Sequence, residues 1–238
     1  MTSDASIALV LCARDGERYL TEALDSVWAQ SRRPDQFVLV DDGSTDSTAA
    51  IAASHPCGPT IVTTRGLGHP AARNLGITST TRNLVAFLDA DDLWQPNCLA
   101  DLSAALANDP LADMVFGYAE QFASPDLTIE QRARYIVPTE AGPGYLAGAM
   151  LVRRSCLDAV GPFDESLRVG DFIAWMIAAR AAHHREIVID HLVLRRRHHP
   201  GNLGRSDSGL RSDFVRIARD AIARRRQSGD VRDSNLPA

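Results

Sequence analysis

The stretch LVAFLDADDLW, residues 84–94, decides the fold class and raises the first question about function. Its first five residues are small or apolar, as in a buried strand, and three carboxylates follow at once, those of Asp89, Asp91 and Asp92. Like charges a few ångströms apart repel one another and raise each other's pKa, so this crowding gains the fold nothing. The stretch therefore indicates that a positively charged group binds at the end of the strand.

Apolar runs alternate with amphipathic stretches from the N-terminus up to this strand. We predict strands at 7–12, 37–40, 60–64 and 84–88, and helices at 20–30, 46–54 and 70–77. This alternation predicts an α/β fold, with a mainly parallel central sheet and helices on both faces. Ligands of such sheets bind beyond the carboxyl ends of the strands, where the segments CARDGERY, DDGSTDST and DADD would converge. In the second of these segments, Ser44 or Thr45 could cap the helix that begins near Asp46.

The pattern changes after Pro96. We predict helices at 99–106 and 171–182, a strand at 114–122, a strand leading into a helix at 155, and one or two strands within 187–197. The segment 124–139 has no clear pattern. We expect a catalytic domain over 1–205, divided into a nucleotide-binding half (about 1–95) and an acceptor half (96–205), then an Arg-rich helix at 206–227 and a disordered tail at 228–238.

The composition limits the classes of function. The chain has 238 residues, is 45% hydrophobic and carries a net charge of -5, which argues against general nucleic-acid binding. It contains no lysine, which excludes Schiff-base chemistry and a P-loop lysine. The irregular spacing of Cys12, Cys57, Cys98 and Cys156 fits neither a zinc site nor a disulfide framework. No apolar run reaches the roughly 20 residues of a membrane span, and no secretory signal is visible, so we expect a cytoplasmic protein that could touch a membrane surface.

Seven segments in order carry a specific resemblance. They are RYLTEALDSVWAQS, VLVDDGSTDST, GHPAARNLGI, FLDADDLWQP, AGAMLVRRS, GPFDESL and RHHPGN. Together they resemble family 2 glycosyltransferases of the GT-A fold over about residues 6–203. The resemblance implies a Rossmann-like sheet with a small acceptor-side region. It also implies an enzyme that transfers a sugar, with inversion, from a nucleotide-diphosphate donor to an acceptor.

The resemblance answers the question raised by the acidic stretch. Asp89-Ala90-Asp91 resembles the DXD motif of the family, which implies that Asp91 binds a divalent cation directly and that Asp89 lies nearer the ribose or a metal-bound water. Oxygen ligands suit Mn²⁺ or Mg²⁺, which would neutralise the leaving diphosphate. His199 is implied to complete the metal site or to touch the leaving phosphate, and Arg195–Arg197 and Arg205 could hold diphosphate charge. The alternative is a solvated acidic loop.

The same resemblance assigns the nucleoside site. Asp42 matches the position that accepts a hydrogen bond from N3–H of uridine, since an ionised carboxylate only accepts. Ala13, Arg14 and Asp15 stand where the family usually has Thr-Tyr-Asn. Arg14 replaces the Tyr, and a guanidinium can also stack on a base. Whether the base is uracil or thymine stays open.

Two further segments are implied to face the donor and the acceptor. In GLGHPAARN, Gly68 and the helix N-terminal amides lie near the donor together with Arg73, unless Arg73 and Asn74 only pack the helix against the metal loop. Aligned on Trp175, the general base of the family is Asp171, although the Glu that usually precedes it is Gly170 here. The alternative for Asp171 is an N-cap of the following helix.

Several alternatives stay open. Arg14 and Gly170 favour a catalytically degenerate nucleotide-sugar binder, and a strand ending in Asp-x-Asp is also found in haloacid-dehalogenase-like phosphatases. The acceptor could be a peptide or protein, a small molecule or a lipid-linked glycan, with residues 117–147 as the expected acceptor wall. The Arg-rich helix could be packed on the domain, touch a membrane or form a lid, and its narrow apolar face favours packing. A homodimer is compatible with the sequence.

Overall fold

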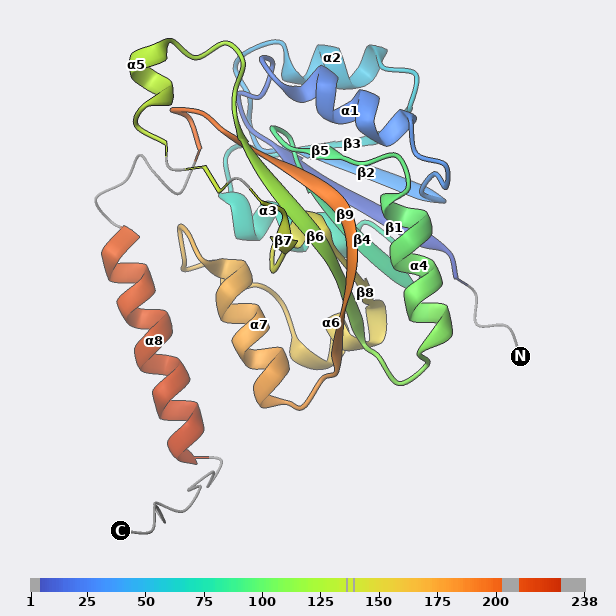
Figure 1. The fold of residues 1–238 in the computed structure, drawn as a ribbon, viewed down its shortest axis with the longest axis vertical. Coiled ribbons are helices and arrows are strands. Elements are labelled where there is room, and N and C mark those ends of the chain that lie inside the picture. Colours follow the sequence, from blue (N-terminus) through green and yellow to red (C-terminus); the bar gives the residue numbers. More distant parts are fainter. Residues whose placement is uncertain (1–4, 136, 139, 203–209, 228–238) are drawn as a thin grey trace.

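A computed structural model describes residues 5–135, 137–138, 140–202 and 210–227 of the chain (Figure 1). The strands are β1 (Ile7–Ala13), β2 (Gln36–Asp41), β3 (Thr60–Thr63), β4 (Leu84–Asp89), β5 (Leu93–Trp94), β6 (Met114–Ala123), β7 (Gly142–Pro143), β8 (Met150–Arg153) and β9 (Glu186–His198). The α-helices are α1 (Leu20–Trp28), α2 (Thr48–Ser54), α3 (His69–Thr78), α4 (Cys98–Asn108), α5 (Ile129–Arg132), α6 (Arg154–Val160), α7 (Asp171–Ala181) and α8 (Leu210–Gln227).

One continuous sheet runs through the molecule in the order β3-β2-β1-β4-β8-β6-β9-β5, with β7 paired to β6. The strands of the first half, β1 to β4, are all parallel. In the second half β8 runs antiparallel to β4 and to β6, whereas β9 runs parallel to β6. The predicted α/β class with a mainly parallel sheet is therefore confirmed, and the mixed part of the sheet lies in the second half of the chain.

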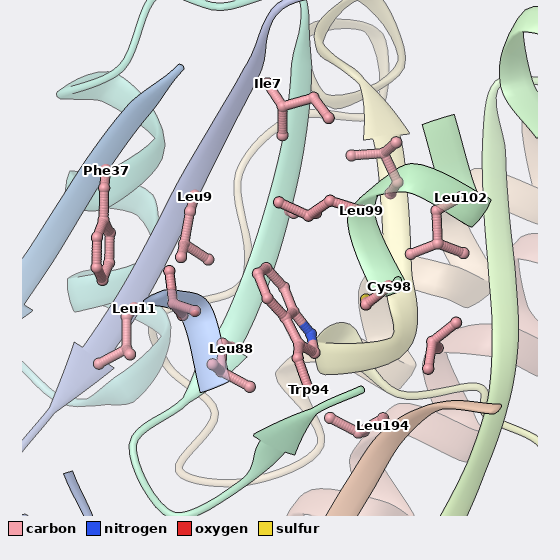
Figure 2. Close-up of a cluster of buried hydrophobic side chains, with 14 of the residues drawn as sticks. Ile7, Leu9, Leu11, Phe37, Leu88, Trp94, Cys98, Leu99, Leu102 and Leu194 are labelled. Atoms are coloured by element: carbon pink, nitrogen blue, oxygen red, sulfur yellow. The ribbon is translucent and has the colours of Figure 1, made fainter. Parts of the chain in front are cut away.

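Both faces of the sheet are covered, because β1 is buried along its whole length. Leu9 and Leu11 point into a core that they share with α1, α2 and α4, part of which is drawn in Figure 2. Val10 and Cys12 point into the opposite core, which α3, α6 and α7 cover. On that side Gly76 lets α3 approach β1 closely, since a Cβ there would lie 2.3 Å from Cγ1 of Val10.

The structure corrects or completes several local expectations. The N-cap residue of α2 is Ser47, and Asp46 accepts the amide hydrogen bond of Thr48 at 2.9 Å, so the prediction of a cap by Ser44 or Thr45 is wrong. The segment 124–139 contains the short α5, which begins with a capping box formed by Thr128 and Gln131. The region 187–197 lies within the single strand β9. The start of the C-terminal helix before 210 and the tail 228–238 lie outside the described residues.

Candidate active site

The loops that follow β1 and β2 are joined at the carboxyl edge of the sheet. The amide of Asp15 donates to Oγ of Ser44 at 3.0 Å, and Oδ1 of Asp15 accepts from the amide of Thr45 at 2.8 Å. The carbonyl of Ala13 accepts from the amide of Asp42 at 2.8 Å. The segments CARDGERY and DDGSTDST thus meet as the parallel topology predicts.

Asp42 lies buried in a cradle of hydrogen-bond donors. Its Oδ1 accepts from Oγ1 of Thr64 at 2.5 Å and from the amide of Leu67 at 2.6 Å, while Oδ2 accepts from the amide of Gly68 at 2.9 Å. Burial acts to raise the pKa of Asp42, but the hydrogen bonds from Thr64, Leu67 and Gly68 outweigh it and lower the pKa. Because a carboxylate offers about four acceptor positions, the cradle leaves room for about one further donor.

Arg14 lies beside this cradle. A Cβ on Gly66 would come within 3.3 Å of its Nη1, and Gly66 has a φ of +90°, so the loop after β3 passes close under the guanidinium. The positive charge of Arg14 also contributes to the lowered pKa of Asp42. The structure therefore brings together five of the residues that the sequence predicts for the nucleotide-sugar donor: Ala13, Arg14, Asp15, Asp42 and Gly68.

The acidic stretch forms the turn that leaves β4. The side chains of Asp89 and Asp91 are 42% and 27% exposed, whereas Asp92 is buried and accepts from the amide of Arg197 at 2.8 Å. Burial, then the charges of Asp91 and Asp89, raise the pKa of Asp92 well above its ordinary value. Ala90 between them packs against the core on the α1 side. Asp89 and Asp91 are thus the two carboxylates of the turn with exposed surface.

Asp91 is held by the segment that follows β9. Its Oδ2 accepts from Nε2 of His199 at 2.8 Å and from Nδ2 of Asn202 at 2.9 Å, and the Tyr19 ring lies 4.6 Å from the imidazole. The amide of Gly201 donates to Nδ1 of His199 at 3.2 Å, which puts the ring proton on Nε2. His199 therefore contacts Asp91, the expected metal ligand, and direct metal binding through Nε2 would require the other tautomer.

The donor atoms of this turn are of the chemical type that a hard divalent cation binds. The exposed carboxylates of Asp89 and Asp91 supply oxygen ligands, and the imidazole of His199 is the ring nitrogen that Mn²⁺ also accepts. Within the part of the chain that the structure describes, no group of three or more His, Cys, Asp or Glu side chains is arranged to hold a metal ion.

Arg197 contacts the acidic turn. It is 1% exposed and lies beneath the acidic turn, where Nε donates to the carbonyl of Asp91 at 2.9 Å and Nη2 donates to Glu22 at 2.8 Å. Arg195 is paired with Glu120. Arg197 is thus engaged beneath the turn and Arg195 by Glu120, while the expectation that Arg195–Arg197 hold diphosphate charge stays a prediction, and Arg205 lies outside the described residues.

Arg73 joins the acidic turn to the predicted base. It is buried, its Nη1 hydrogen-bonds Oδ2 of Asp171, and its Nη2 lies 3.7 Å from Oδ1 of Asp89. Nη2 also lies 2.6 Å from Nε2 of His69. Burial, then the charge of Arg73, lower the pKa of His69, which suits a neutral imidazole that accepts this hydrogen bond. The sequence reasoning missed His69, although it precedes Arg73 by one helical turn on α3.

Asp171 is the first residue of α7, and Gly170 is the N-cap residue with a left-handed φ of +77°. The N-cap alternative for Asp171 is therefore wrong. The packing alternative applies to Asn74, which exchanges hydrogen bonds of 2.9 Å with the amide and carbonyl of Phe163. Arg73, in contrast, faces the carboxylates of the site.

The expected acceptor wall carries several aromatic side chains with exposed surface: Tyr118, Phe122 and Tyr135 are half-buried and Tyr145 is exposed. Tyr145 is packed 5.3 Å from Phe116, measured between ring centroids, and the guanidinium of Arg180 lies 5.1 Å above its ring. Further along the wall, Gln121 lies 2.6 Å from Nε2 of His198. No described helix is long and apolar enough to cross a membrane.

Comparison with known proteins identifies the family. The fold resembles residues 1–349 of S. aureus TarS in complex with UDP-GlcNAc, with a TM-score of 0.73 and 21% identity over 92% of this chain and 66% of that chain. The sequence is 30% identical to succinoglycan biosynthesis protein ExoO of Rhizobium meliloti, over 74% of this chain and 56% of that protein. It is 26% identical to an uncharacterized glycosyltransferase of Rickettsia typhi, over 79% of this chain and 62% of that protein.

The chain thus spans less than two thirds of the length of each of these proteins. The likeness to TarS agrees with the sheet described above and confirms the GT-A fold. The profile of the family described as Glycosyl transferase family 2 matches residues 6–161, which is more than half of the chain. The chain therefore belongs to glycosyl transferase family 2.

Proposed function

We propose that this protein transfers a sugar from a uridine-diphosphate donor to an acceptor nucleophile, with inversion at the anomeric carbon. One observation carries the proposal. Asp89 on the acidic turn and Asp171 on α7 approach the same guanidinium, that of Arg73, although they come from opposite halves of the chain. Such an arrangement provides both a site for the leaving group and a base for the incoming hydroxyl.

The nucleoside would bind at the Asp42 cradle. An ionised carboxylate with one free acceptor position favours a base that offers an N–H donor, as uracil does at N3. Arg14 beside the cradle supplies a planar cation that can stack on the base. The complex of the TarS structure with UDP-GlcNAc supports a uridine nucleotide as the donor of this chain as well.

The diphosphate would lie over the acidic turn. Asp91, with Asp89 beside it and His199 behind it, would hold a Mn²⁺ or Mg²⁺ ion. When bound, such an ion supplies positive charge that stabilises the departing diphosphate. Arg197 keeps the turn in place from below by donating to the carbonyl of Asp91.

Asp171 would act as the general base. Arg73 donates to Oδ2, and Oδ1 receives no hydrogen bond from the described part of the chain, so it can accept the proton of the acceptor hydroxyl. Inversion follows when the hydroxyl attacks from the side of Asp171 and the diphosphate leaves on the side of the acidic turn. A positioned base of this kind contributes about 10² to 10⁴-fold to a rate.

Calorimetric titration tests the donor site. Purified protein is titrated with UDP, GDP, CDP and dTDP, each with Mn²⁺ and with a chelator, and Asp91→Ala is compared with Asp190→Ala, which removes an exposed carboxylate of β9. We expect UDP to bind in a metal-dependent way that is lost in Asp91→Ala and kept in Asp190→Ala. If all four nucleotides fail to bind wild type, the proposal is wrong.

The degenerate nucleotide-sugar binder remains the second candidate, because Gly170 replaces the Glu that would complete the acidic pair before α7. Turnover distinguishes the two. A protein that binds UDP with metal but releases no UDP from UDP-sugars, with or without a panel of acceptors, would be the degenerate binder. The phosphatase alternative is wrong, since the chain belongs to a glycosyl transferase family.

A further inference from the structure

One face of helix α8 packs against the rest of the molecule. It lies beside α7 at the edge of the molecule (Figure 1). Ile217 is buried there, and a Cβ on Gly170 would lie 2.8 Å from its Cδ1 and 3.3 Å from Cε1 of Phe214. Asp213 accepts from the amide of Arg168 at 2.9 Å. These contacts place the first half of α8 against the turn that precedes Asp171.

A second apolar strip on α8 is turned away from these contacts. Val215 and Ile222 are 58% and 55% exposed, and Ala218 and Ala223 join them along a shallow apolar groove. Positions 215, 218 and 222 follow the i, i+3, i+7 spacing of one helix face. Exposed aliphatic side chains in such a continuous strip are typical of a binding surface rather than of a solvated helix.

Of the charged side chains described on α8, Arg219 borders this strip, and Asp213, Arg216 and Asp220 lie toward α7. Arg219 is exposed and borders the groove, whereas Asp213 binds the loop before α7 and Asp220 lines the space between α7 and α8. The helix sequence contains six arginines and two aspartates, a net charge of 6 − 2 = +4, in a chain whose total is -5. Positive charge therefore gathers on the one helix that also exposes the apolar strip.

We propose that the outward face of α8 docks on a membrane surface rich in anionic lipids. The strip of Val215, Ala218 and Ile222 would enter the headgroup region, and the arginines would pair with lipid phosphates. A nucleic acid would use the arginines but leave the aliphatic strip in water. A second copy of the chain would bring two positively charged helices together, which costs energy, so the lipid surface fits both features best.

Vesicle co-sedimentation tests this docking without any assay of catalysis. The protein of 238 residues is mixed with vesicles of phosphatidylcholine alone or with vesicles that also contain phosphatidylglycerol. We expect wild type to bind the anionic vesicles at least about tenfold more tightly, because each Arg near such a surface contributes favourably. The double variant Val215→Ser/Ile222→Ser and the variant Arg219→Glu should each weaken this binding about tenfold.

Matched controls distinguish binding through this face of α8 from a general effect of surface substitutions on vesicle binding. Leu111→Ser removes an exposed aliphatic side chain on another surface, and Arg82→Glu reverses an exposed charge there, so both should bind like wild type. An environment-sensitive fluorophore on Ile222→Cys should shift to the blue on anionic vesicles, whereas the same probe on Leu111→Cys should not. The probe reports docking even if a variant of α8 folds less stably.

Four outcomes would overturn the proposal. Equal binding to neutral and anionic vesicles would remove the role of the arginines. Unchanged binding by the double variant, or an unshifted fluorophore at position 222, would move the contact to another face. A dimer in light scattering without lipid that Val215→Ser/Ile222→Ser dissociates would identify a second copy as the occupant.

Discussion

At the scale of single residues, Asp171 carries the sharpest test of the proposed chemistry. The variant Asp171→Asn keeps the size of the side chain and removes its capacity to take a proton. We expect transfer to fall by about 10² to 10⁴-fold, with UDP affinity unchanged within a few-fold. UDP release and calorimetry measure the two quantities. Asp158→Asn, on the exposed side of α6, is the control and should behave like wild type. If Asp171→Asn transfers sugar within a few-fold of wild type, Asp171 is not the general base.

Arg73 and Asp171 form a buried ion pair, and its energetics make a separate prediction. Both side chains are nearly inaccessible to solvent, so Arg73→Gln leaves the carboxylate of Asp171 buried without its partner. We expect a loss of about 3 kcal/mol in the free energy of unfolding. The double variant Arg73→Gln/Asp171→Asn should recover part of this loss, since it leaves no unpaired charge.

Chemical denaturation of the single and double variants measures this coupling. The exposed pair of Arg185 and Asp109 supplies the control, and Arg185→Gln should cost less than about 1 kcal/mol. A loss in the double variant equal to the sum of the losses in Arg73→Gln and Asp171→Asn would show that the two residues do not stabilise one another in solution.

The rate at which the thiols react with a labelling reagent is predicted to depend on pH. All four cysteines are free, and burial raises the pKa of Cys12 and Cys156 to about 12 and that of Cys57 to about 11. Because only the thiolate reacts, a pKa near 11 leaves roughly one Cys57 in a thousand reactive at pH 8. We expect labelling of the folded protein by a disulfide reagent to be about 100-fold slower than that of the unfolded chain, and to accelerate about tenfold per pH unit up to pH 10.

One outcome would contradict this prediction directly. Nδ1 of His55 lies 3.0 Å from Sγ of Cys57, and Nε2 lies 3.1 Å from Asp25. Fast labelling of a single thiol at pH 7 that is lost in His55→Gln would mean that His55 takes the proton of Cys57. The labelling rate at several pH values, followed by absorbance, decides between the two.

The residues of the site differ in how far the sequence reveals them. Asp89 and Asp91 follow a strand whose apolar pattern is unmistakable, so their place at the end of β4 was predictable. Arg197 was not, because it is one of three consecutive arginines, and only the packing of β9 beneath the acidic turn shows that it is buried. His69 was missed since a single histidine at a helix start has no pattern that separates it from a surface residue.

At the scale of elements, the junction of α7 and α8 explains why the chain has Gly170 where the family usually has Glu. Gly170 adopts a left-handed conformation and lies directly under Ile217 of α8. We expect Gly170→Ala to lower the free energy of unfolding by more than the roughly 1 kcal/mol of backbone strain, because its Cβ also meets Ile217. Thermal or chemical denaturation measures the loss.

Gly58 is the matched control for this change. It also has a positive φ, +57°, but a Cβ there would have no neighbour within 4 Å, so Gly58→Ala should show the backbone strain alone. The difference between the two variants isolates the contact with α8. If both variants lose the same stability, α8 does not pack on this turn in solution, and the glycine at position 170 is needed for another reason.

Helices and strands were predictable where the apolar pattern is clear, as in the continuous apolar run of β1 and the apolar face of α1, and less so where polar side chains determine the structure. The four-residue α5 depends on a capping box within a polar segment, which hydrophobic periodicity does not detect. The hydrogen bond from the amide of Thr48 to Asp46 at the start of α2 depends on the path of the Gly43 turn, which places Ser44 against Asp15 instead. Local polar geometry therefore had to come from the structure.

At the scale of the whole molecule, the candidate site joins two halves of one sheet. Asp42 and Asp89 lie at the ends of parallel strands, an arrangement that the βα alternation predicts. Asp171 and His199 come from the mixed half, and the sequence placed them only through resemblance, because no periodicity indicates where β8, β6 and β9 insert. The continuous sheet is what brings both sets of side chains to one edge.

A site built from both halves predicts that ligand binding stabilises the entire domain. UDP with Mn²⁺ at about 100 times its dissociation constant adds about 2.7 kcal/mol to the free energy of unfolding. For a domain of this size each kcal/mol raises Tm by about 2–4 °C, so we expect Tm to rise by about 5–10 °C. Differential scanning calorimetry with UDP, with Mn²⁺ and with both measures the shift.

Variants at the two ends of the site show whether the stabilisation is shared. Asp42→Asn should reduce the shift by weakening the nucleoside end, and Asp91→Ala should remove the part that depends on Mn²⁺, since Asp91 is the expected ligand. Asp190→Ala should keep the full shift. A full Mn²⁺-dependent shift in Asp91→Ala would place the metal elsewhere, and an equal shift with CDP would argue against base recognition by Asp42, because cytosine presents an acceptor at N3 where uracil presents a donor.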